Sequence, residues 1–100
     1  MAKAYWIARV DVHDEEGYKA YAAANPAIFK KFGGRFVVRG GKYDAVEGNS
    51  RSRNVVIEFA DYETALACYR SPEYQANAKV RQANAITDLI IIEGFDGPQP

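Results

Sequence analysis

Residues 5–12 read Tyr5-Trp6-Ile7-Ala8-Arg9-Val10-Asp11-Val12. Successive side chains of a β-strand point to opposite sides of its sheet, so this stretch predicts a strand with two unlike faces. One face is wholly apolar and carries Trp6, Ala8, Val10 and Val12. The other is apolar at one end and charged at the other, with Tyr5, Ile7, Arg9 and Asp11. A sheet of such strands has one face for its own helices and a second face that is too apolar for water.

The composition is that of one globular domain over residues 1–100, with 48% hydrophobic and 26% charged residues. Thirteen basic and thirteen acidic residues cancel, so no global positive field favours nucleic acid or an anionic membrane. The N-terminus does not resemble a signal peptide, and no apolar run is long enough to span a bilayer. The single cysteine, Cys68, cannot form an internal disulfide. These features predict a cytoplasmic protein with no nucleic-acid or membrane partner.

The segments between the strands carry helix signals. Asp14 is expected to cap a helix that ends at Gly33-Gly34. Within it, Pro26 predicts either a kink or the start of a second short helix. Asp61 is expected to cap the next helix, and Ser71-Pro72 to end that helix and start another that runs to about residue 84.

Three further strands are predicted at residues 35–39, 54–59 and 88–93, and residues 43–47 can continue the first of them. The order is therefore strand, helix, strand, strand, helix, strand. Four antiparallel strands with two right-handed crossovers satisfy this order as a ferredoxin-like α+β fold, with both helical segments on one side of the sheet. We expect the ordered part to cover about residues 3–94, with a loose C-terminal tail.

Polarity assigns the alternate residues of each strand to two faces. The face under the helices is expected to carry Trp6, Ala8, Val10, Phe36, Val38, Val55, Ile57, Phe59, Ile90 and Ile92. The opposite face then carries Tyr5, Ile7, Arg9, Asp11, Arg35, Val37, Arg39, Val56, Glu58, Leu89, Ile91 and Glu93. Its apolar members would expose more apolar surface than soluble monomers usually tolerate. A second copy, packed sheet against sheet about a two-fold axis, is the expected cover. This prediction of a homodimer survives an inverted assignment, because both faces stay largely apolar.

Several segments together resemble a known family. They are Tyr5–Val12, Gly33–Gly41, Val56–Phe59, Tyr69–Gln75 and Glu93-Gly94. Over about residues 4–94 the chain resembles the domain-of-unknown-function 1330 family, which belongs to the dimeric α+β barrel superfamily. The resemblance implies a ferredoxin-like fold and a dimer. The superfamily includes small monooxygenases, haem-degrading enzymes, muconolactone isomerases and chlorite dismutases, so the resemblance implies monooxygenase or isomerase chemistry only by analogy.

Three charged residues lie in strand interiors on the same predicted face. They are Arg9, Arg39 and Glu58, with Tyr5 on that face as well. The arginines could hold a carboxylate or enolate in a cavity, with Glu58 as the general base. The alternative is a structural ion-pair network across the dimer, without a ligand.

A second candidate set is the tyrosines of the predicted helices, Tyr18, Tyr21, Tyr69 and Tyr74. Their helical spacing could place them along a ligand cleft between helices and sheet, which is where the superfamily resemblance implies a site. The alternative is a core role, with the hydroxyls near the surface. Cys68, on a predicted helix, is expected to be a small buried hydrophobe.

His13 is the only histidine and lies at a strand-to-helix corner. It could act as a catalytic acid or base near neutrality, or simply be an exposed loop residue. The chain has no zinc-ligand spacing and no Ser-His-Asp or Cys-His arrangement that can be placed, so we expect no metal and no cofactor. The sequence thus predicts a small dimer that binds an anionic or aromatic organic molecule, either as a cofactor-free enzyme or as a binding protein. A non-catalytic structural or accessory dimer is the alternative.

Overall fold

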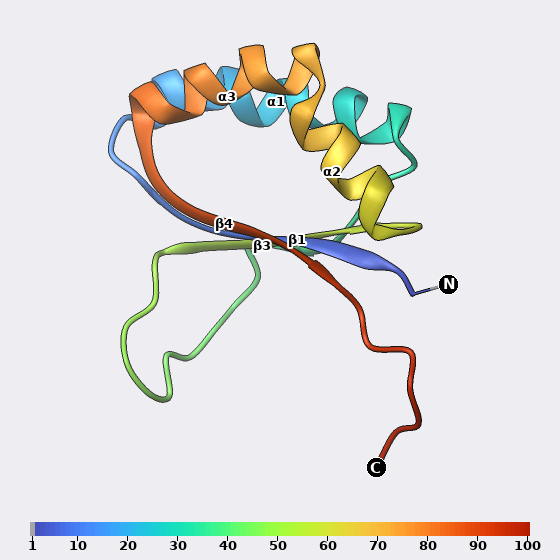
Figure 1. Ribbon diagram of the computed structural model, residues 1–100. Helices are drawn as coiled ribbons and strands as arrows, with labels where there is room; N and C mark the ends of the chain where they lie inside the picture. Colours follow the sequence, from blue (N-terminus) through green and yellow to red (C-terminus); the bar gives the residue numbers. More distant parts are fainter. Residues whose placement is uncertain (1) are drawn as a thin grey trace.

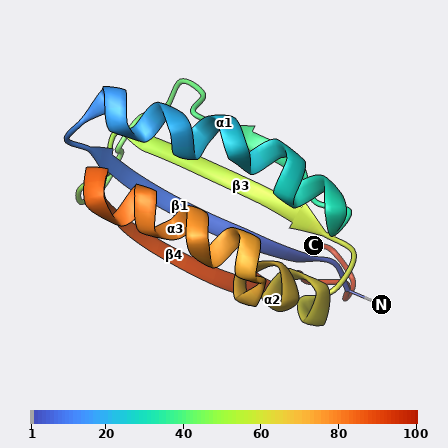
Figure 2. The ribbon, with the colours of Figure 1, turned by 90° about the horizontal axis from the view of Figure 1, so that it is seen from above.

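The computed structural model describes residues 2–100, with three helices packed on one side of a four-stranded sheet (Figure 1). The elements in chain order are β1 (Ala4–Val12), α1 (Glu15–Lys31), β2 (Arg35–Arg39), β3 (Arg53–Phe59), α2 (Tyr62–Arg70), α3 (Pro72–Asn84) and β4 (Ala85–Glu93). The sheet is antiparallel, in the order β2-β3-β1-β4. Seen from above, α1 and α3 run side by side along the strands (Figure 2). The predicted ferredoxin-like α+β fold is confirmed.

The predicted caps define the helices. The Asp14 carboxylate accepts a hydrogen bond from Gly17 N at 3.1 Å, and the Asp61 carboxylate accepts one from Thr64 N at 2.8 Å. Ser71 Oγ donates to the last turn of α2 and accepts from the first turn of α3. Helix α1 continues through Pro26, so no second helix begins there.

Two strand boundaries differ from the prediction by more than one residue. Residues 43–47 do not extend β2; they belong to the loop of residues 40–52, which projects on the side of the sheet away from the helices (Figure 1). Strand β4 begins at Ala85 rather than residue 88, because Ala85 already has extended backbone angles and pairs with Val12 of β1. None of the helices in residues 2–100 is long and apolar enough to cross a bilayer.

The face assignment of β4 was wrong. Leu89 pairs with Ala8 and Ile91 with Trp6, so Leu89 and Ile91 face the helices, while Ile90 faces the other way together with Ile92. Both sets of β4 side chains are apolar, so polarity could not choose between them. Pairing with β1 sets the register, and a shift of one residue exchanges the faces.

The faces of β2 also change partway along the strand. Phe36 pairs with Ile57 of β3, but the next pair is Val38 with Val56, and Arg39 follows. One extra residue in β2 forms a bulge, which reverses the alternation of side chains. Val38 therefore turns away from the helices and Arg39 turns toward them. The prediction that Arg9, Arg39 and Glu58 share a face is wrong for Arg39.

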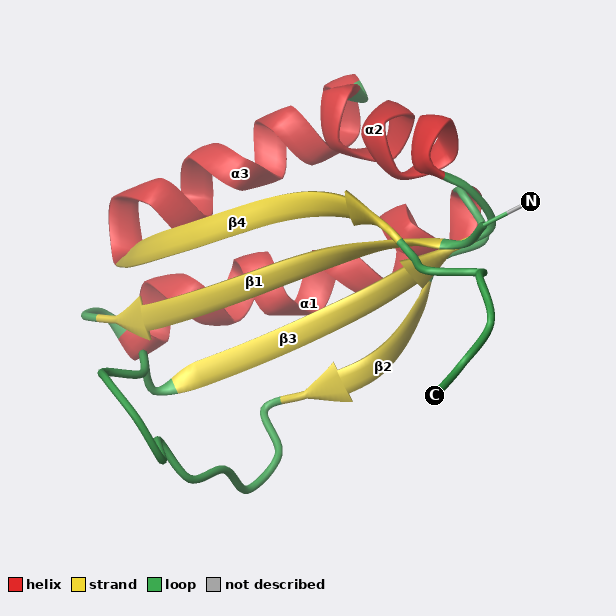
Figure 3. Ribbon diagram, turned by 60° about the horizontal axis from the view of Figure 1, so that its bottom comes forward, coloured by secondary structure: helices red, strands yellow, loops and turns green. Residues whose placement is uncertain are grey.

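We call the side under the helices the covered face; it includes Trp6, Ala8, Val55, Ile57, Leu89 and Ile91. The other side is the open face, with Tyr5, Ile7, Val56, Glu58, Ile90 and Ile92. No helix lies in front of the open face in Figure 3.

The core of the covered face is organised around Trp6 of the central strand β1. Its ring centroid lies 5.1 Å from that of Phe29 in α1 and 4.8 Å from that of Tyr74 in α3. Its indole N–H donates to the Ala65 carbonyl of α2 at 2.9 Å. One side chain therefore holds all three helices to the sheet and orients its own ring.

Candidate functional site

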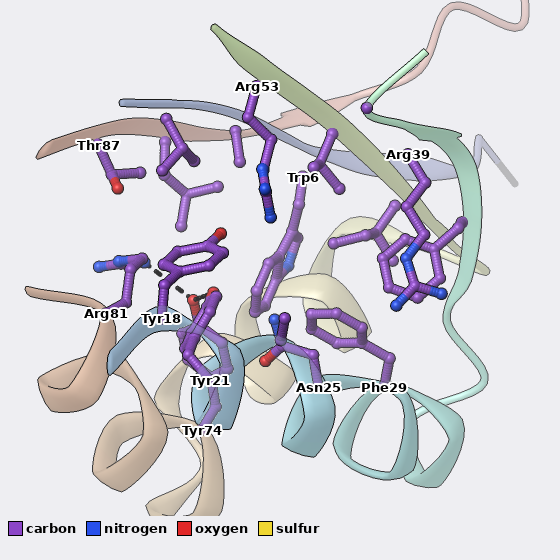
Figure 4. Close-up of a pocket in the computed structure, with 18 residues that line it drawn as sticks. Trp6, Tyr18, Tyr21, Asn25, Phe29, Arg39, Arg53, Tyr74, Arg81 and Thr87 are labelled. Carbon is purple, nitrogen blue, oxygen red and sulfur yellow. Dashed lines mark hydrogen bonds between the residues drawn. The ribbon is translucent and has the colours of Figure 1, made fainter. Parts of the chain in front are cut away.

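A cavity of about 340 Å³ lies between the covered face and helices α1 and α3 (Figure 4). Its floor includes Ala8 of β1, and its roof includes Ala22 of α1. These side chains are short, whereas neighbouring Trp6 and Phe29 are large enough to hold the two layers apart. Space is left where small side chains face one another, and its size suits a small organic molecule.

The cavity wall is electropositive. Three arginines line it, Arg39 from β2, Arg53 from β3 and Arg81 from α3. Within residues 2–100, the wall contains no Asp, Glu, His or Lys side chain. Arg39 is exposed and Arg53 has the Glu15 carboxylate of α1 at 3.8 Å, so the buried Arg81 is the group that most favours an anionic occupant.

Arg81 is the most deeply placed of the three, with 6% of its surface exposed. Its Nη1 donates to Tyr74 Oη at 2.9 Å, and its guanidinium carbon lies 5.7 Å from the centroid of the Tyr21 ring. Its Nε is buried and has no hydrogen-bond partner. Burial disfavours the charged form, but the Tyr74 and Tyr21 oxygens outweigh this and raise the pKa of Arg81. Arg81 is therefore a buried cation with tyrosines around it in place of a carboxylate.

Two tyrosine hydroxyls meet beside Arg81. The Oη atoms of Tyr21 and Tyr74 lie 2.6 Å apart, and Tyr74 is fully buried. Burial is the main cause that raises the pKa of Tyr74, and it also raises the pKa of Tyr18 on the same wall. At neutral pH the hydroxyls of Tyr74 and Tyr18 therefore keep their protons, and they can donate hydrogen bonds but cannot serve as ready bases.

Helix packing fixes the position of Tyr21. The side-chain amide of Asn77 in α3 donates to the Tyr21 carbonyl at 3.1 Å and to Asn25 Oδ1 at 2.9 Å. Both asparagines are buried, at 9% and 8% exposure. These bonds connect α1 to α3 directly above the cavity and hold the tyrosine pair in register.

The other two arginines stack on aromatic rings. The guanidinium carbon of Arg53 lies 4.9 Å from the centroid of the Tyr18 ring, and that of Arg39 lies 4.3 Å from the Phe36 centroid. Arg39 is exposed. In Figure 4, Arg81 and Thr87 lie at one end of the cavity and Arg39 at the other. The cavity therefore has the buried Arg81 at the α3–β4 corner and an exposed arginine at its far end.

The candidates predicted from the sequence are divided between the two sides of the sheet. The cavity is lined by Arg39 and by three of the four candidate tyrosines, Tyr18, Tyr21 and Tyr74. Tyr69 packs against the rings of Trp6 and Tyr74, with centroids 5.8 and 5.5 Å away, behind the cavity wall. His13 is exposed in the turn between β1 and α1.

The remaining candidates lie on the open face. Glu58 accepts hydrogen bonds from Arg35 Nε at 2.9 Å, Tyr5 Oη at 3.3 Å and Lys3 Nζ at 3.4 Å. The Arg35 hydrogen bond is the main cause that lowers the pKa of Glu58. Arg9 donates to Asn54 Oδ1 at 3.3 Å and lines a separate hollow of about 270 Å³ under the loop of residues 40–52. The structure does not bring Arg9 and Glu58 together with Arg39.

Sequence reasoning did not assign a role to Arg81, Arg53 or Thr87. A signal for Arg81 was present, since it shares a helical stripe with Tyr74 and Ala78, and both of these are buried. A charged residue inside an apolar stripe is a candidate for a buried functional group. Arg53 and Thr87 carried no comparable signal, because each lies one residue before the predicted start of its strand, at residue 54 or 88.

Residues 2–100 contain no group of three or more His, Cys, Asp or Glu side chains that could hold a metal ion. Cys68 is buried in α2, and burial is the main cause that raises its pKa to about 12. Its thiol is therefore protonated at neutral pH and a poor nucleophile.

Solved structures share this fold. A protein of unknown function, RPA0582 from Rhodopseudomonas palustris, aligns with a TM-score of 0.77 and 19% identity, over 96% of this chain and 85% of that one. SnoaB, a cofactor-independent oxygenase from Streptomyces nogalater, aligns at 0.66 and 18%, over 100% and 97%. A dimeric protein of unknown function and ferredoxin-like fold from Bacteroides fragilis aligns at 0.63 and 13%, over 94% and 98%. At such identities these likenesses show the fold alone.

The comparison with curated proteins finds no match. A family model does match, over residues 3–95, which include every strand and helix around the cavity. The chain belongs to the family described as Domain of unknown function (DUF1330).

Proposed function

We propose that this protein binds a small organic anion with a flat, aromatic body in the cavity between the covered face and helices α1 and α3. Arg81 carries the proposal. A buried guanidinium normally has a carboxylate partner, because an uncompensated buried charge is costly. Here its closest polar contact is a tyrosine, and one of its N–H groups is unpaired. An anionic ligand supplies the missing partner.

The cavity walls support an aromatic body for the ligand. Trp6, Phe29 and Phe36 present their rings along the cavity between its two ends. The rings of Phe29 and Phe36 meet edge to face at 5.6 Å, and those of Trp6 and Phe29 at 5.1 Å. Such a wall accepts another ring in an offset or edge-on arrangement.

Calorimetric titration with 2-naphthoate tests this function. The wild-type protein is expected to bind the acid and to bind neutral 2-naphthalenemethanol at least about tenfold more weakly, because only the acid pairs with the arginines. The Ala22→Leu variant fills the cavity and is expected to abolish binding. Ala23→Leu makes the same change at an exposed position of α1 and is the matched control.

Equal binding of acid and alcohol, or undiminished binding by Ala22→Leu, contradicts the proposal. Native mass spectrometry of freshly purified protein searches for the natural ligand directly. The absence of any bound anion in both measurements favours the alternative, a non-catalytic structural or accessory dimer.

A homodimer through the open face is part of the proposal. Ile90, Ile7, Val56 and Val38 form one apolar row across all four strands. Mostly polar and charged residues flank this row: Asp88, Arg9 and Asn54 on one side, and Tyr5, Glu58 and Arg35, together with Ile92, on the other. An apolar centre with a polar border is the usual layout of an interface, and a second copy offers the same row. The similar protein from Bacteroides fragilis is described as dimeric.

A second candidate function is that of a cofactor-independent oxygenase. Its support is the likeness over the whole chain to SnoaB, which is described as such an enzyme. Oxygen uptake with polyhydroxylated naphthalenes, measured with an electrode on metal-free protein, tests it. Oxygen uptake by the wild type and by Ala23→Leu, but not by Ala22→Leu, supports an oxygenase. Binding without uptake points to an isomerase or to a binding protein.

A further inference from the structure

Two buried polar atoms of residues 2–100 have no hydrogen-bond partner, Arg81 Nε and Thr87 Oγ1, and both residues line the cavity. Arg81 lies three residues before the end of α3, and Thr87 lies two residues after the start of β4. The chain turns back on itself between them, so both are at the α3–β4 corner, as Figure 4 shows. An unpaired buried polar group is costly. Two such groups at one end of one cavity indicate that a ligand atom belongs there.

The hydrogen bonds beside them have a direction. A guanidinium only donates, so Tyr74 Oη accepts from Arg81 Nη1. Either hydroxyl of the Tyr21–Tyr74 pair can donate to the other, but only donation by Tyr74 gives the Tyr74 hydroxyl hydrogen a partner in the described chain, and we take this arrangement. The hydroxyl hydrogen of Tyr21, which lines the cavity, is then free for a ligand. Each bond polarises the next, so the charge of Arg81 strengthens Tyr21 as a donor.

We infer that the cavity binds its ligand as a preformed oxyanion, with the charged oxygen at the α3–β4 end between Tyr21 Oη, Arg81 Nε and Thr87 Oγ1. The inference rests on the proposed function and adds the orientation of the ligand and its donors. The aromatic body then extends past Trp6 toward Arg39. Tyr74 is a positioning residue, since it acts on the ligand through Tyr21.

The same wall restricts the class of ligand. Its titratable and charged side chains are Arg39, Arg53, Arg81, Tyr18, Tyr21 and Tyr74, and in the described chain none of them is a carboxylate or an imidazole. A ligand that enters as a neutral acid thus finds no ordinary base. The site takes compounds already ionised near neutrality, which are carboxylates and the conjugated phenolates or enolates. Simple alcohols are excluded.

The probe for the experiment is 4-nitrophenol, whose colour reports its ionisation near neutral pH. Trp6 is the only tryptophan and lies in the cavity wall, so quenching of its fluorescence reports binding. The wild-type protein is expected to lower the apparent pKa of the bound phenol by about one unit, which equals a tenfold preference for the anion. Tyr21→Phe and Arg81→Met are expected to remove most of this shift. Tyr74→Phe keeps the Tyr21 hydroxyl but breaks the chain, and is expected to give an intermediate shift.

The control is Tyr62→Phe on the exposed side of α2, which should behave as wild type. Circular dichroism and thermal unfolding verify that each variant is folded; Tyr21→Phe keeps the ring and provides the decisive comparison if Arg81→Met unfolds. Benzoate, added in competition, shows whether a carboxylate shares the site with the phenolate.

The outcomes separate the two proposals. If Ala22→Leu blocks binding but the phenol pKa is unshifted, the inference is overturned and the cavity remains a binding site. The same holds if the pKa shifts equally in Tyr21→Phe and wild type. If 4-nitrophenolate does not quench Trp6 fluorescence and calorimetry detects no binding of benzoate or 2-naphthoate, both proposals are overturned.

Discussion

The two faces of the sheet treat charge in opposite ways. On the open face, the carboxylates of Glu58, Asp11 and Asp88 form ion pairs with neighbouring cations. Glu58 is surrounded by Arg35 and Lys3, and Arg51 forms ion pairs at 2.9 Å with both Asp11 and Asp88. On the helix side of the sheet, Arg53 has Glu15 at 3.8 Å, but Arg81 of α3 is buried and forms no ion pair. A charge with a local partner needs no ligand to explain it, whereas the buried charge without one is the ground on which a ligand is proposed.

Apolar side chains show the reverse contrast. On the covered face, Trp6 and Ile57 are 1% and 3% exposed. On the open face, Ile90 and Ile92 are 54% and 46% exposed. The apolar side chains of the covered face are therefore buried within the chain, whereas those of the open face remain exposed.

The largest expected effect is a difference in the loss of stability between alanine substitutions on the two faces. Ile57→Ala removes a buried side chain next to Trp6 and should lower the free energy of unfolding by about 2–5 kcal/mol. Ile90→Ala makes the same change on the open face and should cost less than about 1 kcal/mol in dilute protein, where no partner covers it. Urea unfolding at low protein concentration measures both. Equal losses at the two positions contradict the difference between the faces.

The next effect concerns assembly. Wild-type protein is expected to sediment as a dimer at micromolar concentration. Ile90→Lys places an ammonium group in the apolar row of each copy and should weaken dimerisation by about 2–3 kcal/mol, roughly a hundredfold in the dissociation constant. The unfolding free energy of the dilute protein should change little, because Ile90 is already exposed there.

Ala23→Lys, at an exposed position of α1, is the control and should stay dimeric. A wild-type monomer in this concentration range, or a dimer that Ile90→Lys leaves intact, removes the argument for an interface on the open face.

The fold was predictable because its signals are local. Asp14, Asp61 and Ser71 cap helices through atoms three residues away, so a short window of sequence contains the whole interaction. The order of strands and helices then left one simple arrangement, with the helices on one side.

The candidate site was only partly predictable because it depends on register. Arg39 reaches the cavity through a bulge in β2, and an extra residue in a strand has no reliable sequence signal here. Thr87 and Leu89 reach it through pairing with β1, which the equally apolar neighbours of Leu89 could not reveal. Tyr74 was recognised from its helical spacing, but its bond to Tyr21 joins residues 53 positions apart.

The smallest expected effect tests the pairing on the open face by pH. Arg35, above all, lowers the pKa of Glu58 below its ordinary value of 4.5. A carboxyl group with a lowered pKa in the folded state adds stability above its unfolded pKa, and this stability is lost as the pH falls through the folded pKa. Between 4.5 and that lower pKa, wild-type protein should lose stability faster than Glu58→Gln, which cannot titrate. Arg35→Met keeps the carboxyl but removes its main partner, and should also flatten the dependence. Urea midpoints are measured for all three proteins across the acid range. Parallel curves would show that the neighbours of Glu58 do not lower its pKa.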